Sequence, residues 1–215
     1  MLNQLIKNAQ PYWQQYVEHD FVKQLANGAL PPECFRHYLK QDYLYLFHYS
    51  RAFALAIFKA KNFSQMEIPR KSLDSICQEI QLHLAYCRQW GISEAEIFAT
   101  QESAACVAYT RYLLDCGATG GLAEIYAAIT PCAVGYAQIA RYITENYPRL
   151  ANNPYQTWID TYASEAFQKE AEETSAFLTA LCADFTPTQQ NHIQHIFTTA
   201  TRMEIAFWQM GLDLA

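Results

Sequence analysis

The residues PPECFRHYLKQDYLYLFHYSRAFALAIFKA, at positions 31–60, decide the fold class. Two prolines open the stretch, and proline suits the first turn of a helix because a missing backbone N–H costs nothing there. From Glu33 to about Ala60, apolar and aromatic residues recur at helical spacing. The stretch therefore predicts one long helix at the centre of the protein.

Helical spacing extends over nearly the whole chain, and alternating β-branched runs bounded by turn signals are missing. We therefore predict an all-α fold, a single multi-helical bundle over residues 1–215, with about eight to ten helices. A first helical region should end at Asn27-Gly28, where glycine suits the left-handed cap. Ser93 with Glu96 should form a capping box, and Thr186 should cap the last helix. The other expected helices are 69–90, 102–116, 121–146, 154–162, 164–183 and 187–210.

Composition excludes several function classes. The chain is 51% hydrophobic, but no run approaches the ~20 apolar residues of a membrane span. Residues 1–7 lack a signal core, so we expect a cytoplasmic protein. Seven cysteines without a C-x-x-C pair predict reduced thiols. A net charge of −6 without a basic cluster disfavours nucleic acid and membrane surfaces as partners, and favours a neutral or cationic small ligand.

Cys132 stands out in the segment TPCAVGY, residues 130–136. Pro131 lacks a backbone N–H and crowds the carbonyl of Ala127, so the helix should kink beside the thiol at a cost of roughly 3 kcal/mol. One interpretation is a small buried hydrophobic residue, since free cysteine is often buried. The proline beside it makes Cys132 the best candidate for chemistry in the chain.

Two carboxylates lack a local cation. Asp42 shares a helix face with tyrosines, and Glu204 has only apolar, aromatic or threonine neighbours three and four positions away. Because burying a bare charge is costly, each needs a tertiary partner, hydrogen bonds or a ligand. A structural aspartate bonded to tyrosine is the alternative for Asp42. Glu79 and His83 form an i,i+4 pair, for which we expect a surface or buried hydrogen bond and no chemistry.

Tyrosine is abundant, with fifteen residues. Tyr109, Tyr136 and Tyr162 lie on apolar helix faces, where most such residues belong to the core with a bonded hydroxyl. A subset is able to line a pocket in which rings stack on a flat heterocycle and carboxylates bind its amino groups or a cationic ring. Together, the cysteine, two carboxylates and aromatic residues indicate nucleophilic catalysis on such a ligand.

Five ordered motifs resemble the TenA family, the thiaminase II proteins of thiamin salvage, which share the heme oxygenase-like helical fold. They are EHDFVKQL at 18–25 followed by Gly28 and Leu30, YLKQDYLY at 38–45, Pro131-Cys132 with Gly135-Tyr136, WIDTY at 158–162, and Arg202-Met203-Glu204 with Phe207-Trp208. The resemblance covers nearly all of the chain.

The resemblance implies a site and a reaction. Cys132 would be the nucleophile and Glu204 the general acid/base, and the pyrimidine pocket would consist of Asp42, Tyr45, Tyr109, Tyr136, Tyr162 and Phe207. The reaction would be hydrolysis at the methylene carbon attached to a 4-amino-2-methylpyrimidine, with the aminomethyl pyrimidine favoured over thiamin as substrate. No metal, nucleotide or organic cofactor is expected, and the family suggests a homotetramer.

Two other function classes stay open. A heme or di-iron oxygenase on the same fold needs several Glu and His residues projecting inward, and only Glu79 and His83 make a plausible pair. His19, at a helix end, is more typical of a cap than of a heme ligand. A noncatalytic pyrimidine-binding or regulatory protein would use the same aromatic pocket without Cys132 and Glu204 as a working pair.

Overall fold

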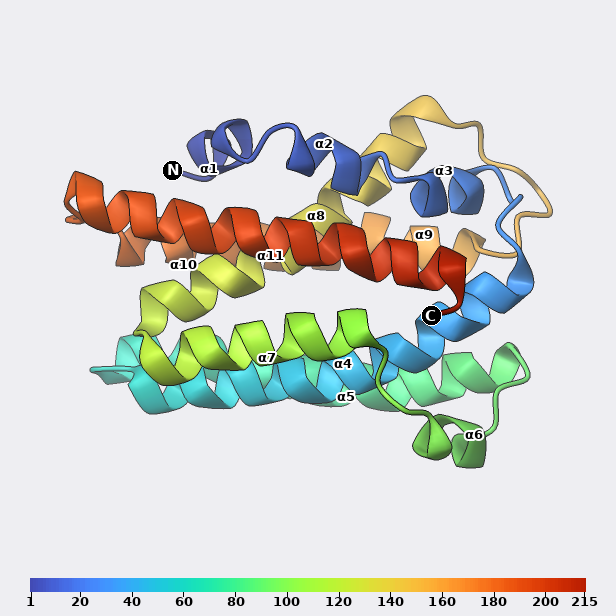
Figure 1. The fold of residues 1–215 in the computed structure, drawn as a ribbon, viewed down its shortest axis with the longest axis horizontal. Helices are drawn as coiled ribbons and strands as arrows, with labels where there is room; N and C mark the ends of the chain where they lie inside the picture. Colours follow the sequence, from blue (N-terminus) through green and yellow to red (C-terminus); the bar gives the residue numbers. More distant parts are fainter.

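The computed structural model describes all 215 residues, and it contains eleven α-helices and no strand (Figure 1). The all-helical prediction is therefore confirmed. The helices are α1 (Leu2–Asn8), α2 (Tyr12–Val17), α3 (Asp20–Ala26), α4 (Pro32–Lys59), α5 (Phe63–Gln89), α6 (Glu94–Ala99), α7 (Ala104–Thr119), α8 (Leu122–Asn146), α9 (Gln156–Ala163), α10 (Glu165–Leu181) and α11 (Pro187–Asp213).

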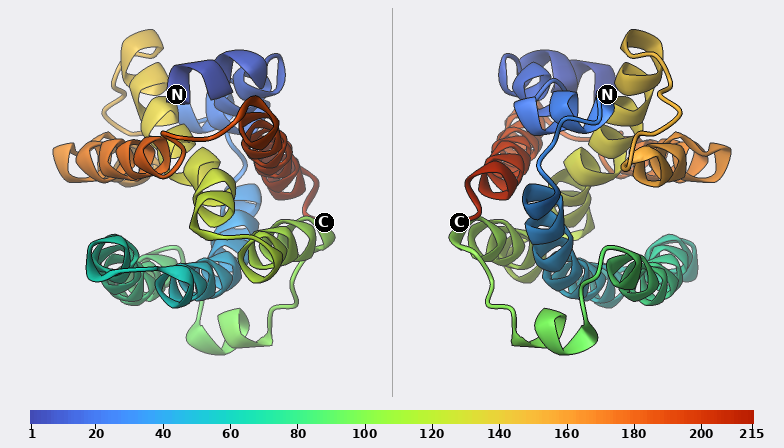
Figure 2. Two further views of the ribbon diagram at one scale, coloured as in Figure 1. Left: turned by 90° about the vertical axis from the view of Figure 1, so that its left-hand side faces the viewer. Right: turned by 90° about the vertical axis from the view of Figure 1, so that its right-hand side faces the viewer.

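The long helices are arranged around α4 and α8. In Figure 1, α4, α5 and α7 form one side of the molecule, α1–α3 and α9–α11 form the other, and α8 crosses between them. Helix α8 packs against α7, α9, α10 and α11, while α4 packs against α5 and α7. The end-on views of Figure 2 show α5 and α10 on the same side of the molecule, with α4 and α8 further in.

Local caps set most helix boundaries, as the sequence predicts. Thr186 accepts a hydrogen bond from the backbone N–H of Gln189, whose side chain bonds back to the cap. Ser93 also caps its helix, but the reciprocal bond predicted for Glu96 is missing because that carboxylate binds Lys40, with Oε1 3.2 Å from Nζ. Gly28 has a φ of +74°, the left-handed conformation expected of it.

Two expectations about the helices are wrong. The first helical region is three short helices, α1 to α3, which raises the total above the eight to ten predicted. Helix α5 begins at Phe63 and not at Pro69, because Asn62 caps it by accepting a hydrogen bond from the backbone N–H of Gln65. Pro69 then lies inside the helix, where it lacks a backbone N–H and crowds the carbonyl of the preceding turn, as Pro131 does in α8.

Helix α8 runs through Pro131 without interruption and changes direction along its length (Figure 1). Seven of its first fourteen residues, together with neighbours in α4 and α11, contribute buried side chains to one continuous apolar core. No helix combines the length and the apolar composition required to cross a membrane.

Candidate active site

Cys132 lies in the wall of a partly enclosed cavity of about 50 Å³. Of the seven cysteines it is the only one in this wall, because Cys77 is exposed and the other five are buried elsewhere. The wall is built from α4, α5, α8, α9 and α10, and most of it is aromatic or aliphatic. Its residues are Asp42, Tyr45, Leu46, Tyr49, Phe53, Ile76, Glu79, Cys132, Ala133, Tyr136, Tyr162, Phe167, Glu170, Ala171 and Thr174.

The eight residues predicted for the site fall into two neighbouring groups. Asp42, Tyr45, Cys132, Tyr136 and Tyr162 line the cavity. The other three, Tyr109, Glu204 and Phe207, lie behind Tyr45. The Tyr45 ring centroid is 5.1 Å from that of Tyr109 and 5.7 Å from that of Phe207. The fold thus gathers residues from five helices that are far apart in the sequence.

Glu204 is buried on α11, with 2% of its surface exposed. The hydroxyl of Tyr109, on α7, donates a hydrogen bond of 2.6 Å to its Oε1. Burial raises the pKa of Glu204 to about 8, and the Tyr109 hydrogen bond opposes that rise. The carboxyl is therefore protonated or close to its midpoint at neutral pH, which suits a group that both gives and takes protons.

The Cys132 thiol is also held in its neutral form. Burial raises its pKa well above the ordinary value, and the nearby Glu204 carboxyl raises it further, while the Tyr45 hydroxyl opposes the rise. Because the thiolate is the nucleophile, Cys132 needs either a base or a neighbouring positive charge to react.

Asp42 finds a tertiary neighbour in His83 on α5, whose Nδ1 lies 3.7 Å from Oδ2. The Nε2–H of His83 donates to the carbonyl oxygen of Leu39 at 2.8 Å, so the neutral ring presents an unprotonated Nδ1 to Asp42. Burial raises the pKa of Asp42 to about 7 and lowers that of His83. The predicted hydrogen bond between Glu79 and His83 is not formed, because the backbone carbonyl takes the His83 donor and Glu79 lines the cavity.

Gly135, three residues after Cys132, lies against the ring of Tyr16 and leaves no room for a larger side chain. A Cβ at this position would lie 2.1 Å from Cε1 of Tyr16 and 2.6 Å from its hydroxyl oxygen. Tyr16 is fully buried, so its ring has no room to retreat. Glycine thus lets the Tyr16 ring pass directly against α8, less than one turn after Cys132.

Comparison of the whole sequence with known protein families agrees with the resemblance that the five motifs indicate. Residues 6–214 match the TENA/THI-4/PQQC family. The chain belongs to this family. A protein of Haemophilus influenzae named only as uncharacterized is 77% identical over the full length of both chains. The aminopyrimidine aminohydrolase of Halalkalibacterium halodurans is 34% identical over 97% of this chain and 94% of its own.

Solved structures of other proteins agree with the fold. A protein from Silicibacter sp. TM1040, described as a TenA family transcription regulator, superposes with a TM-score of 0.92 at 37% identity, over 98% of this chain and 96% of its own. A domain from Shewanella denitrificans with a heme oxygenase-like fold gives a TM-score of 0.79 at 14% identity, over 100% and 93% of the two chains. The heme oxygenase-like fold expected of this TenA family chain is thereby confirmed.

Several residues of the cavity wall have no signal in the sequence. Glu170 stands in the segment KEAEE, residues 169–173, which resembles a solvated helix face. Phe167 is an isolated aromatic residue, and Glu79 is four positions from a histidine that does not bind it. Tyr49 is the exception, because it shares the predicted helix face of Asp42.

The residues do not fit an oxygenase centre. No three His, Cys, Asp or Glu side chains are grouped so that they would hold a metal ion. His19 caps α3, and its Nδ1 accepts a hydrogen bond of 3.2 Å from the backbone N–H of Phe21. Its ring is therefore occupied in the role that the sequence predicts.

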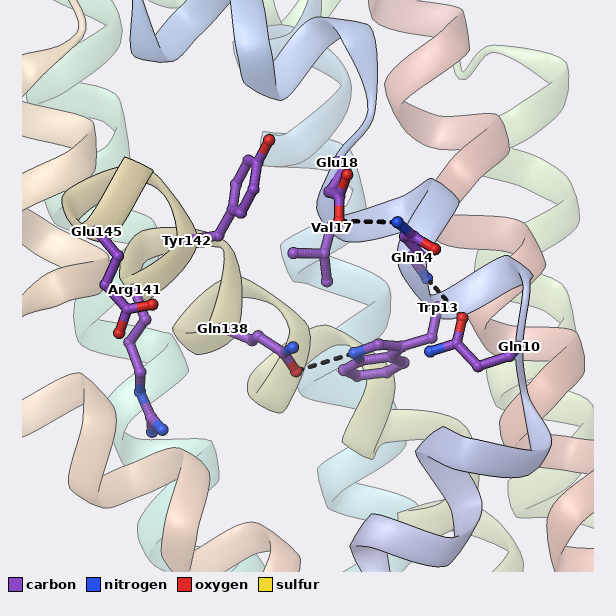
Figure 3. A pocket seen from close by; sticks show the side chains of 9 residues that line it. All are labelled: Gln10, Trp13, Gln14, Val17, Glu18, Gln138, Arg141, Tyr142 and Glu145. Atoms are coloured by element: carbon purple, nitrogen blue, oxygen red, sulfur yellow. Dashed lines mark hydrogen bonds between the residues drawn. The ribbon is translucent and has the colours of Figure 1, made fainter. Parts of the chain in front are cut away.

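A larger hollow of about 560 Å³ lies between α2 and α8 (Figure 3). In it, the indole N–H of Trp13 donates to Oε1 of Gln138 at 2.9 Å, and Gln14 donates to Glu18 at 3.1 Å. Trp13, Gln138, Gln14 and Glu18 thus bond within the hollow, while Arg141 donates to Gln168 outside it. None of the eight predicted site residues lines this hollow.

Proposed function

We propose that the chain is a thiamin-salvage hydrolase that converts 4-amino-5-aminomethyl-2-methylpyrimidine to the 5-hydroxymethyl compound and also hydrolyses thiamin. Family membership and the relatives named aminopyrimidine aminohydrolase support this class of reaction. The observation that carries the proposal is the position of Cys132. It is the one cysteine in the wall of an aromatic cavity, and the Glu204 carboxyl is near enough to perturb its pKa.

In the proposed reaction, Cys132 and Glu204 exchange one proton. The thiol gives its proton to Glu204, and the thiolate forms a C–S bond to an electron-poor ring carbon. Addition of the thiolate pushes a ring electron pair towards the exocyclic carbon, and the exocyclic C–N bond breaks. The leaving nitrogen keeps the bonding electrons and takes the proton from Glu204. Water then adds to the exocyclic carbon while Glu204 takes a proton from it. Cleavage of the C–S bond releases the thiolate, which takes this proton from Glu204 and becomes the thiol again.

The remaining cavity residues would bind the pyrimidine. Asp42 would hydrogen-bond the amidine-like edge of the ring, and its pKa of about 7 lets it share a proton with a ring nitrogen. Tyr45, Tyr136 and Tyr162 would enclose the ring faces. Tyr109 would hold Glu204 through the 2.6 Å hydrogen bond, and Phe207 would support Tyr45 from behind.

A noncatalytic pyrimidine-binding regulator is the second candidate. What favours it is the description of the Silicibacter relative as a transcription regulator. The net charge of −6 and the lack of a basic cluster argue against direct contact with nucleic acid.

We also propose a cytoplasmic homotetramer that buries apolar residues of α4, α5 and α6. Phe58, Phe63 and Phe98 are each more than 60% exposed on these helices. Exposed apolar side chains that gather on one side of a protein are typical of association surfaces. Size-exclusion chromatography with light scattering measures this state.

Product analysis tests the hydrolase. Purified protein is given the aminomethyl pyrimidine or thiamin, and the hydroxymethyl pyrimidine is quantified by mass spectrometry. We expect product from the wild type and a loss of at least about a hundredfold in Cys132→Ser. Cys77→Ser is the matched control, because Cys77 is exposed and away from the cavity, and it should keep full activity. A folded wild type that binds the hydroxymethyl pyrimidine but turns over neither substrate would favour the regulator.

A further inference from the structure

A second cleft, of about 400 Å³, lies directly outside the Cys132 cavity. The two spaces share five wall residues, which are Asp42, Glu79, Tyr162, Phe167 and Glu170. The cleft lies between α4, α5, α9 and α10, on the side of the molecule where Figure 2 shows α5 and α10. A ligand held in the cavity therefore extends into this cleft if it is larger than one ring.

Three carboxyl groups from three different helices meet at the shared wall. Asp42 comes from α4, Glu79 from α5 and Glu170 from α10. Neither wall contains a lysine or an arginine. The only basic side chain in these walls is His83, and its N–H donates a hydrogen bond to the carbonyl oxygen of Leu39. The chain itself therefore supplies no fixed positive charge to these carboxyl groups.

Asp42 in particular has no strong partner. Its side chain is only 9% exposed, it faces both spaces, and its nearest basic atom is the His83 Nδ1 at 3.7 Å, beyond hydrogen-bond distance. A carboxyl group buried to this degree is normally paired or hydrogen-bonded. The Tyr38 hydroxyl is the one hydrogen-bonding group that opposes the rise in the pKa of Asp42, so the other lone pairs of its oxygens are available to a group that arrives with the ligand.

The carboxyl groups also act on one another. Burial, together with the charges of Asp42 and Glu170, raises the pKa of Glu79 to about 8. Burial and Glu173 raise the pKa of Glu170. The other titratable groups that face Glu79 are His83 on α5, Tyr49 on α4, Cys132 on α8 and Tyr162 on α9. None of them is a cation at neutral pH, so an incoming positive charge would relieve this repulsion.

Aromatic rings complete the wall. The Tyr162 ring lies 4.6 Å from that of Trp158 and 4.8 Å from that of Phe167, centroid to centroid. All three residues line the cleft. Aromatic faces attract organic cations, most strongly where water is excluded.

We propose that this outer cleft is a subsite for an organic cation, and that Glu79 and Glu170 select substrates whose group beyond the pyrimidine methylene is positively charged. The inference rests on the proposed function. It assigns to the two glutamates a preference for an ammonium or thiazolium group over a neutral one. It also gives Asp42 a position between the two spaces, where it contacts both the ring and the cationic group.

Binding measurements with charge-matched ligands test this subsite. In a Cys132→Ser background, which prevents turnover, calorimetry gives the Kd of the aminomethyl pyrimidine, of thiamin and of the neutral hydroxymethyl pyrimidine. The double variant Glu79→Gln/Glu170→Gln should bind both cationic ligands at least about tenfold more weakly, and the neutral one within about twofold of the parent. Glu172→Gln is the matched control, since this exposed residue of α10 lines neither space, and it should change none of the three.

Proton release gives a second readout. Binding of a cation should expel protons from the carboxyl groups, so the calorimetric heat should depend on the ionisation enthalpy of the buffer, and less so in the double variant. Equal losses for charged and neutral ligands, or no loss, would overturn the subsite.

A failure of the hydrolase proposal looks different. It appears as a wild type that binds pyrimidines without turnover, and the three Kd values then still test the subsite. If the parent binds none of the pyrimidines, benzylammonium and benzyl alcohol serve as the charged and neutral pair. A preference for the cation that the double variant abolishes would uphold the subsite, and equal binding of the two would refute it.

Discussion

Replacing Glu204 with glutamine removes one titrating group from the core and preserves its size. The Tyr109 hydroxyl, which donates to Glu204 at 2.6 Å, is able to donate to the amide oxygen as well. The packing of α7 against α11 should therefore persist. The substitution isolates the effect of the carboxyl proton on stability.

The sign and size follow from the pKa of Glu204. Burial raises it from 4.5 to about 8, so the folded chain holds a proton here that the unfolded chain releases. The stabilisation from this group is complete below about pH 4.5 and is lost as the pH rises to about 8. At roughly 1.4 kcal/mol per pH unit, the interval from about pH 5.5 to about pH 7.5 removes up to roughly 3 kcal/mol from the free energy of unfolding. The glutamine variant lacks this loss.

Thermal unfolding of the ligand-free protein, followed by circular dichroism at fixed protein concentration, measures the effect. Asp42 and Glu79 also have raised pKa values, so both proteins should lose stability in this pH interval. The wild type should nevertheless lose more stability than Glu204→Gln. The Tm of the variant minus that of the wild type should therefore increase by up to roughly 6–12 °C from about pH 5.5 to about pH 7.5. Exposed Glu172→Gln should run parallel to the wild type. A Tm difference between Glu204→Gln and the wild type that does not change with pH would refute the assignment of this proton to Glu204.

Two further substitutions test the structure around the site. Tyr109→Phe leaves the buried Glu204 carboxyl without its donor, so the free energy of unfolding in urea should fall by roughly 1–3 kcal/mol, and unchanged stability would contradict the hydrogen bond. Gly135→Ala places a Cβ 2.1 Å from the buried Tyr16 ring, so it should lower the free energy of unfolding by roughly 1–3 kcal/mol or more. A wild-type Tm for Gly135→Ala would show that Tyr16 moves freely.

The helices were predictable because their signals are local. Thr186 and Gln189 cap α11 through contacts three residues apart, and Gly28 ends the first helical region with a left-handed turn. The predicted start of α5 at Pro69 was wrong. Proline often marks the first turn of a helix, but here it lies inside one. The residue that starts the helix is Asn62, which caps it seven positions before the proline.

The site was predictable where a residue is anomalous on its own helix. Asp42 and Glu204 lack local cations, and the structure buries both of them. Glu170 shows no such anomaly, because its place in the cavity wall depends on how α10 packs beside α8. The contact between Tyr16 and Gly135 joins two distant segments, so neither residue reveals it alone.

In the proposed reaction, the burial that suits Glu204 to carry a proton also disfavours the thiolate of Cys132, the proposed nucleophile. Low polarity raises the pKa of Glu204 into the neutral range and that of the Cys132 thiol well above its ordinary value. No lysine or arginine in the cavity wall offsets this, so in the proposed reaction a bound cationic substrate would supply the charge that stabilises the thiolate. The proposed reactivity of Cys132 is therefore coupled to the presence of a cationic substrate.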